Sequence, residues 1–154
     1  MAAPGVVFEP PIEFILRQTG RFRRELENLI PLWERFKVVM EDVERSRFDS
    51  EGHGDWPPLA ESTRRYRDGQ PLLVQTGALR ESLVNPGQAA DTGPLRMSWG
   101  TDVPYAHYHQ DGGTIAGRPP QRKILDIRVE DRRRLEREMV SWINETAALT
   151  FGRI

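Results

Sequence analysis

The chain contains no cysteine among its 154 residues. Disulfide bonds and thiolate zinc sites are therefore excluded, and folding in an intracellular compartment is expected. No apolar run approaches the ~20 residues that a helix needs to cross a bilayer, so no membrane segment is predicted. The opening stretch, MAAPGVVFEPP, lacks a charged start followed by an apolar core, and no signal peptide is expected.

An excess of charge of either sign is also missing. The 22 Lys and Arg residues face 23 Asp and Glu residues, which leaves a net charge of −1, whereas a dedicated nucleic-acid-binding protein shows a basic excess on one face. The most basic stretch, residues 121–138, interleaves seven basic with five acidic side chains, as a solvated helix face does. DNA binding through the helix that carries the arginines of residues 132–137 is therefore only the third-ranked hypothesis for the function of this chain.

Long amphipathic stretches are what the chain does have. Helices are predicted over residues 12–29, with Gly20 as a potential interruption, and over residues 31–48. Pro31 suits the first turn of the second helix because its missing N–H is not needed there. A last helix is predicted over residues 130–149. Its apolar stripe is formed by Leu135, Met139, Trp142, Ile143 and Thr146.

Between these helices the pattern changes to turns and short elements. A short helix is predicted over residues 77–83, with Thr76 as its N-cap because a threonine hydroxyl accepts a hydrogen bond from an N–H one turn on. Residues 95–99 alternate apolar and polar side chains, which predicts a half-buried strand, and residues 82–84 are its candidate antiparallel partner. A further short strand is predicted near residues 123–127.

These elements together predict the fold class α+β, with N-terminal helices, a small antiparallel sheet and a C-terminal helix. The length suits one domain, which we place at residues 12–154, behind an N-terminal arm of residues 1–11. Trp56, in a loop with two glycines and two prolines, is expected to anchor that loop in the core.

The stretch 103–113, VPYAHYHQDGG, holds two of the three histidines and raises the question of metal chemistry. His107, His109 and a carboxylate could serve a small metal-dependent hydrolase, which is the alternative function. Pro104 and the glycines favour a turn or short helix, however, on which the two histidines point to nearly opposite sides. The sequence also lacks the G-x-S-x-G motif that would present a catalytic serine. A packing corner is therefore the favoured interpretation, and no catalytic, cofactor-binding or metal-ligating residue is assigned.

Five short motifs follow one another between residues 30 and 148. In chain order they are Arg47-Phe48 with Glu51-Gly52; Trp56, Pro58, Leu59 and Thr63; Leu73, Thr76, Gly77, Leu79 and Ser82; Tyr105, Ala106, His109, Gln110 and Gly112; and Pro120, Arg122, Ile124 and Leu125. In this order and spacing they resemble the phage virion morphogenesis, or tail completion, family of the Mu-like type. Members often carry a second proline and an aromatic residue after the arginine, where this chain has Lys123 and Ile124.

The resemblance implies a non-enzymatic structural protein of a tailed phage or phage-like particle. It would form a ring of identical subunits, a hexamer by the family-like expectation, that joins head to tail or terminates the tail. The implied partners are the head-side connector or adaptor and the tail-tube proteins; DNA would pass through without specific binding, and no membrane is involved. The implied location is the neck or tail of the virion, after assembly in the cytoplasm of the bacterial host.

The same resemblance marks a set of residues for structure or assembly. Within the corner of residues 105–113, His109 and Gln110 would form hydrogen bonds inside the corner or across a subunit interface, and His107 stands outside the pattern. The loops 51–56 and 112–120, together with the arm, are candidate contacts with a neighbouring subunit. The residues assigned to the motif are Trp56, Thr76, Gly77, Leu79, Tyr105, His109, Gln110, Gly112 and Arg122.

Overall fold

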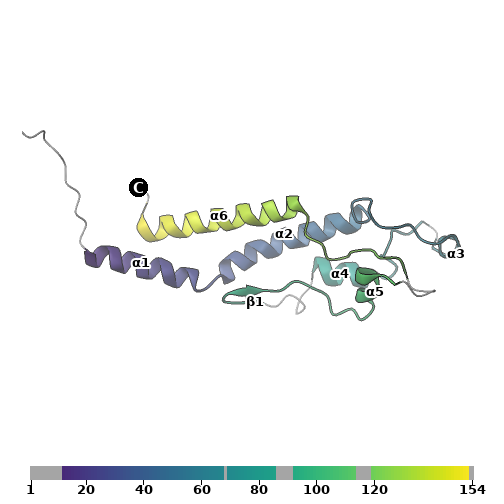
Figure 1. Ribbon diagram of the computed structural model, residues 1–154, viewed down its shortest axis with the longest axis horizontal. Helices are drawn as coiled ribbons and strands as arrows, with labels where there is room; N and C mark the ends of the chain where they lie inside the picture. Colours follow the sequence, from purple (N-terminus) through teal and green to yellow (C-terminus); the bar gives the residue numbers. More distant parts are fainter. Residues whose placement is uncertain (1–11, 68, 86–91, 114–118, 153–154) are drawn as a thin grey trace, which may run out of the picture.

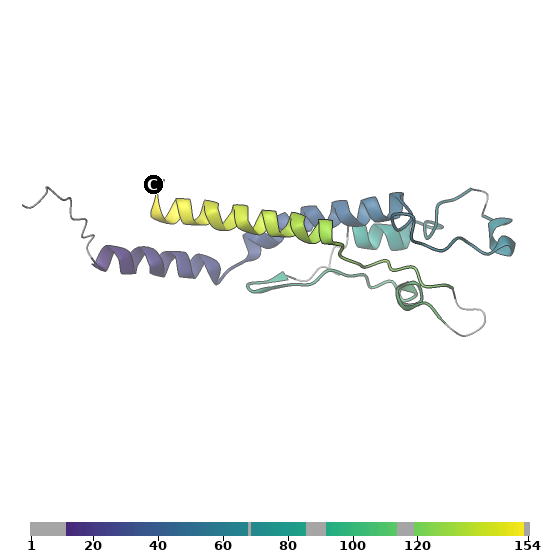
Figure 2. The ribbon, with the colours of Figure 1, turned by 45° about the horizontal axis from the view of Figure 1, so that its top comes forward.

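The computed structural model describes residues 12–67, 69–85, 92–113 and 119–152. The predicted arm, residues 1–11, and the middle of the predicted contact loop, residues 114–118, lie outside these ranges. The molecule is elongated, with its long helices along the axis, the short helices gathered toward one end and the small hairpin beside its middle (Figures 1 and 2). No helix in the described ranges is long and apolar enough to cross a membrane.

Three long helices build the axis of the molecule. Helix α1 spans Ile12–Leu26, α2 spans Ile30–Asp49 and α6 spans Val129–Phe151, so all three predicted helices are confirmed. Gly20 lies inside α1 and does not interrupt it. Pro31 stands in the first turn of α2, where a missing N–H leaves no hydrogen bond unmade. α1 and α2 follow each other nearly end to end, and α6 runs back along both (Figure 1).

The predicted apolar stripe of α6 is only partly covered. Trp142 is buried against the helices beside it, but Met139 and Ile143 keep 39% and 36% of their surface exposed. α2 and α1 contact one side of α6, and the remainder of the stripe faces outward. The stripe is therefore wider than the surface that the described parts of α1 and α2 cover.

The short elements are α3 at Glu61–Arg64, α4 at Ala78–Val84, α5 at Ala106–Asp111, and the strands β1 at Thr92–Gly93 and β2 at Arg96–Met97. β1 and β2 form a two-stranded antiparallel sheet in which Thr92 pairs with Met97. The α+β class is confirmed, with far less strand than predicted. The hairpin is tied to the junction of α1 and α2, where the Leu29 N–H donates to the Pro94 carbonyl at 2.7 Å.

Three local predictions are wrong. Residues 82–84 are no strand: they end α4, because Leu83 and Val84 are buried in the helix that packs on α2. The strand predicted over 95–99 shrinks to Arg96–Met97, since it pairs with its own hairpin partner only. Residues 123–127 form an irregular segment rather than a strand.

The predicted cap of α4 is also wrong in position. Gly77 is the N-cap, with a φ of 76°, and Thr76 lies one residue before it. The Thr76 hydroxyl accepts from the Ala78 N–H at 3.3 Å, two residues on rather than one turn on. The left-handed conformation favours glycine at the cap itself.

The main hydrophobic core lies where the C-terminal end of α2 meets α4, α5 and the segment before α6. Its buried members are Phe48, Trp56, Leu72, Leu79, Leu83, Ala106 and Ile124. The expectation for Trp56 is confirmed: 7% of its surface is exposed, and its ring meets Phe48 edge-on at 5.3 Å between centroids. Residues far apart in the chain thus converge on one core.

Candidate functional site

The irregular segment of residues 121–125 is the place where most of the motif residues meet. Gln110, on α5, faces it and makes three hydrogen bonds to its backbone. The side-chain carbonyl accepts from the N–H groups of Ile124 and Leu125, both at 2.9 Å, and the side-chain amide donates to the Leu125 carbonyl at 2.9 Å. One glutamine therefore satisfies the backbone groups that a neighbouring strand would otherwise bind, which explains why no strand forms here.

Trp56 and Arg122 hold the same segment from the other side. The Trp56 indole N–H donates to the Lys123 carbonyl at 3.1 Å. Arg122 is 3% exposed and donates to the carbonyls of Pro57 and Pro58 at 2.8 and 3.0 Å. Burial lowers the pKa of the Arg122 guanidinium, with a smaller contribution from Arg67. A buried cation is thus bound by backbone oxygens, which locks the loop of residues 56–58 to this segment.

Two glycines allow the close approaches in this corner. Gly112 has a φ of 67°, and a Cβ there would stand 2.7 Å from the backbone nitrogen of Gln121. The approach is needed because the Arg122 N–H donates to the His109 carbonyl at 2.7 Å. Gly52 has a φ of 72°, and a Cβ there would overlap the Trp56 ring. Both positions require glycine for conformation and for space.

The remaining motif residues surround a neighbouring hollow. Thr76, Leu79, Tyr105 and His109 are among the residues that line a cavity of about 380 Å³. The rings of Tyr105 and His109 meet edge-on with centroids 6.3 Å apart. Burial lowers the pKa of His109, and the nearby charges of Arg122 and Arg67 lower it further, so this imidazole is neutral at pH 7.

The two histidines of α5 face different surroundings. His107 is exposed and its ring lies tilted against that of Tyr108, with ring centroids 3.9 Å apart, whereas His109 packs on Tyr105. No group of three His, Cys, Asp or Glu side chains placed to hold a metal ion occurs among the described residues. The short helix expected from Pro104 and the glycines is confirmed as α5.

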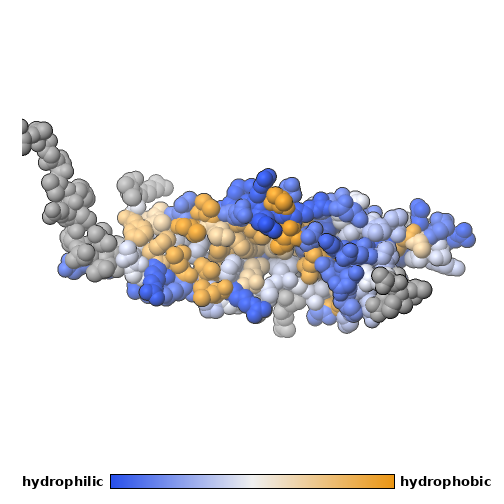
Figure 3. All heavy atoms as spheres, viewed as in Figure 1, coloured by the Kyte–Doolittle hydropathy of each residue, from blue (hydrophilic) through white to orange (hydrophobic). Residues whose placement is uncertain are grey.

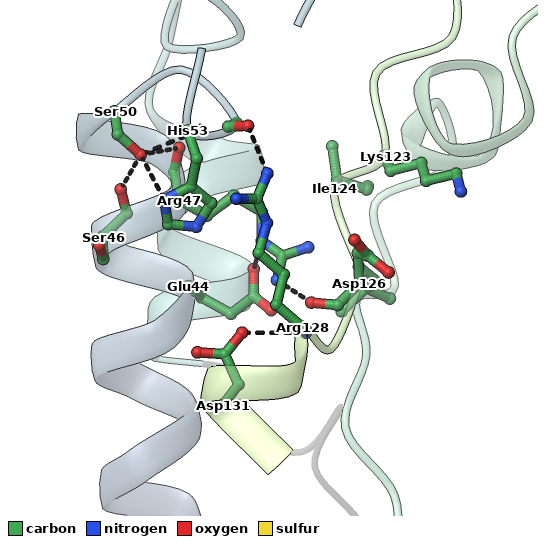
Figure 4. A network of polar contacts seen from close by, with 12 residues as sticks. Glu44, Ser46, Arg47, Ser50, His53, Lys123, Ile124, Asp126, Arg128 and Asp131 are labelled. Carbon is green, nitrogen blue, oxygen red and sulfur yellow. Dashed lines mark hydrogen bonds and ion pairs between the residues drawn. The ribbon is translucent and has the colours of Figure 1, made fainter. Parts of the chain in front are cut away.

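A buried ion pair beside this corner was not anticipated from the sequence (Figure 4). Glu44 is fully buried and Arg47 is 3% exposed, with 3.6 Å between the Arg47 Nε and a Glu44 carboxylate oxygen. Arg47 also donates to the Asp126 carbonyl. Burial raises the pKa of Glu44 to about 7; Arg47 opposes that shift, and the charges of Asp131 and Asp126 add to it. The sequence did contain a signal for the burial of Glu44, because this residue stands four residues after Met40, on the apolar face of α2.

Arg128, near this ion pair, links the loop of residues 51–56 to the start of α6. Its backbone N–H donates to Asp131 at 3.1 Å, which caps the helix, and its side chain binds Asp55 and the Gly52 carbonyl. The loop 51–56, predicted as a contact with a neighbour, is therefore bound to its own α6 on this side. Figure 4 shows these side chains converging between α2 and the segment that leads into α6.

The structure thus brings the nine motif residues into one connected region. Gln110, Trp56, Arg122, Gly112 and His109 fix the segment of residues 121–125. Thr76, Gly77, Leu79 and Tyr105 form the start of α4 and the hollow beside it. The side chains of this region hold separate backbone segments together by hydrogen bonds. Most of its polar groups therefore have their partners within the chain.

The model of the phage virion morphogenesis family matches residues 12–144, which is most of the chain. No curated protein and no solved structure gives a significant match.

Proposed function

The chain belongs to the phage virion morphogenesis family, and from that premise we propose that it is a structural subunit of the virion neck or tail. Family membership supports a part in building the phage particle rather than in catalysis. The finer proposal is a ring of identical subunits, with six copies expected, that joins the head to the tail or terminates the tail. It would assemble in the cytoplasm of the bacterial host.

The exposed apolar surface of α6 carries this proposal. Figure 3 shows apolar residues gathered over the part of the molecule where α1 and α6 lie. The exposed apolar side chains of α6 are Val129, Met139, Val140, Ile143, Leu149 and Phe151. Val140 exposes 57% and Leu149 79% of its surface. Large exposed apolar side chains gathered in one region of a protein are characteristic of protein–protein contact surfaces.

An elongated subunit suits a ring. A ring uses a heterologous interface, in which one surface patch fits a different patch on the next copy. The apolar surface of α6 would form one side of that interface. The head-side connector or adaptor and the tail-tube proteins would contact the two faces of the ring.

The charges of α6 favour passage of DNA over sequence-specific binding. Arg134 donates to Asp42 at 2.6 Å, and Arg128 is paired with Asp55. Glu145 at the other end of the helix binds Arg35. These ion pairs leave a balanced surface, as the net charge of −1 also indicates.

The test is the mass of the purified protein in solution, followed by imaging of any oligomer. A closed ring with a central hole is the expected result, and its mass gives the copy number. Where the free protein is monomeric, the same question is put to the assembled particle by labelling the protein and locating it. A label absent from the neck and tail contradicts the proposal.

A further inference from the structure

A groove of about 560 Å³ lies on the molecule between α2, the β1–β2 hairpin and the start of α6. Its apolar lining residues are Trp33, Phe36, Met40, Met97, Trp99, Leu125, Ile127 and Leu135. The walls are held in place, because the Trp33 indole N–H donates to the Gly93 carbonyl at 2.9 Å and so binds the hairpin to α2. A fixed apolar groove of this size suits a short run of apolar side chains.

Two polar groups lie behind this lining. Both carboxylate oxygens of Glu44 and the indole nitrogen of Trp99 are buried without a hydrogen-bond partner among the described residues. Glu44 keeps no exposed surface, so an occupant of the groove meets the apolar side chains rather than these polar atoms. The groove therefore selects its occupant by apolar contact.

Residues 5–11 have the matching composition. Val6, Val7 and Phe8 are three consecutive apolar side chains, and no charged side chain occurs before Glu9. Pro10 and Pro11 disfavour a helical conformation for the residues directly before them. A segment without a carboxylate at its apolar part can approach Glu44 without repulsion between like charges.

The distances along the chain exclude the groove of the same molecule. α1 has 15 residues, so about 22 Å of helix separate Ile12 from the end of α1, before α2 and its groove begin. α1 extends from the α2 junction away from the hairpin (Figures 1 and 2). Phe8 stands four residues before Ile12, which spans at most about 14 Å of extended chain. The apolar triplet therefore falls short of its own groove and can meet only that of another copy.

We propose that the groove is the docking site for Val6, Val7 and Phe8 of a neighbouring copy of this chain. The three apolar side chains of each arm would lie against the apolar lining of the groove of the next subunit. This inference rests on the proposed assembly of identical subunits, and it names the contact that orders them. Arm and groove are different surfaces, as a head-to-tail ring requires.

The test is the formation of a disulfide between two variants of the whole chain. Because the chain has no native cysteine, any disulfide must join introduced thiols. Val7→Cys is mixed with Ile127→Cys, which places a thiol at the rim of the groove on a residue 44% exposed. A disulfide forms only where the two Cα atoms come within about 7 Å of each other. We expect a mixed dimer on mild oxidation, with the bridge between positions 7 and 127 identified by mass spectrometry.

The control pairs Val7→Cys with Val38→Cys, on the same helix as the groove but not in its lining and 66% exposed. The 7–127 product should exceed the 7–38 product several-fold. Equal yields in a solution that contains oligomers overturn the docking proposal while leaving the ring intact. A specific 7–127 bridge in assemblies that never close into a ring supports the docking and contradicts the ring.

A protein that stays monomeric is tested with a synthetic peptide of residues 2–11. Titration into the full-length protein should change the fluorescence of Trp33 and Trp99 in a saturable way. A peptide carrying Phe8→Asp should bind several-fold more weakly. No saturable change, or equal affinity of the two peptides, overturns the docking proposal without bearing on the location of the protein in the virion.

Discussion

Two side chains of this protein, Glu44 and Gln110, have unusual electrostatic or hydrogen-bonding surroundings. Glu44 is the strongest case, because a fully buried carboxylate faces one arginine at 3.6 Å and the negative charges of Asp126 and Asp131. Gln110 is the second, since its side chain makes hydrogen bonds to the backbone of residues 124 and 125 that a neighbouring strand would otherwise make. Each of these residues leads to a prediction about stability.

Glu44 should make stability depend on pH. Its pKa in the folded state is about 7, above the ordinary value of 4.5, so the folded chain holds this proton more tightly than the unfolded chain. Its contribution to the free energy of unfolding is complete below pH 4.5 and is lost as the pH rises through 7. The loss amounts to about 3 kcal/mol, at about 1.4 kcal/mol for each unit of the pKa difference.

Glu44→Gln should remove that loss, and urea unfolding between pH 5 and pH 8 measures it. Glu41→Gln, the same substitution one turn earlier on α2, is the matched control and should keep the pH dependence of the native chain. A Glu44→Gln variant that loses as much stability as the native chain across this range would contradict the assignment.

Gln110→Leu should destabilise the protein by about 2 to 6 kcal/mol, because two N–H groups lose their acceptor at about 1 to 3 kcal/mol each. Ile124, one of the two donors, is 1% exposed. Gln110→Glu should cost less at low pH, where the protonated carboxyl still accepts from both N–H groups and its O–H can donate to the Leu125 carbonyl; at neutral pH its second carboxylate oxygen would be repelled by that carbonyl. Thermal and urea unfolding measure both variants, and equal losses would show that the acceptor is not what matters.

At the scale of elements, the corner from α5 to residue 125 is a loop structure made rigid by close backbone approach. The His109 carbonyl accepts from the Arg122 N–H, and Gly112 turns the chain so that Gln121 can pass beside it. This corner positions one wall of the groove through Leu125 and Ile127. A change in the corner should therefore act on the groove as well as on stability.

Gly112→Ala tests this, with Gly54→Ala as its matched control. Both glycines have positive φ, 67° and 83°, so both substitutions carry the cost of about 1 kcal/mol of a left-handed backbone. Only at Gly112 would the new Cβ collide with backbone, at 2.7 Å from the Gln121 nitrogen, whereas nothing lies within 4 Å at Gly54. Gly112→Ala should therefore lose clearly more stability in thermal unfolding. Equal losses would mean that the corner relaxes freely.

At the scale of the whole molecule, shape and surface point to association. α6 is covered by α2 and α1 on one side only, and its apolar residues continue round to the outer face. A chain that built its core for itself alone would bury more of this stripe. The elongated form and the uncovered stripe suit a subunit whose folding is completed by its neighbours.

Val140→Asp should weaken self-association without changing the fold. Val140 is 57% exposed on the outer face of α6, so the charge costs little in the isolated subunit but would be buried in an assembly. Val38→Asp, on an α2 position 66% exposed, is the control and should leave association as it was. Sedimentation measures the association, and circular dichroism confirms that helix content is kept. Unchanged association of Val140→Asp would remove this face of α6 from the interface.

Local pattern was sufficient for the long elements. The helical spacing of apolar residues, together with Pro31, predicted three helices whose structural bounds agree closely. The order of short motifs was enough to indicate the family, whose model matches residues 12–144. These features depend on neighbours within a few residues, so they can be read along the chain.

Only the tertiary structure decided which distant segments meet. The docking of the hairpin on α2, the glutamine that replaces a strand at residues 124 and 125, and the burial of Glu44 all depend on contacts between residues far apart in sequence. A short alternating stretch does not indicate whether a strand, a side chain or solvent will take its hydrogen bonds. The sequence by itself determined the helices and the family; packing determined where the hairpin docks, the buried ion pair and the groove, because those arise only when separate elements are brought together.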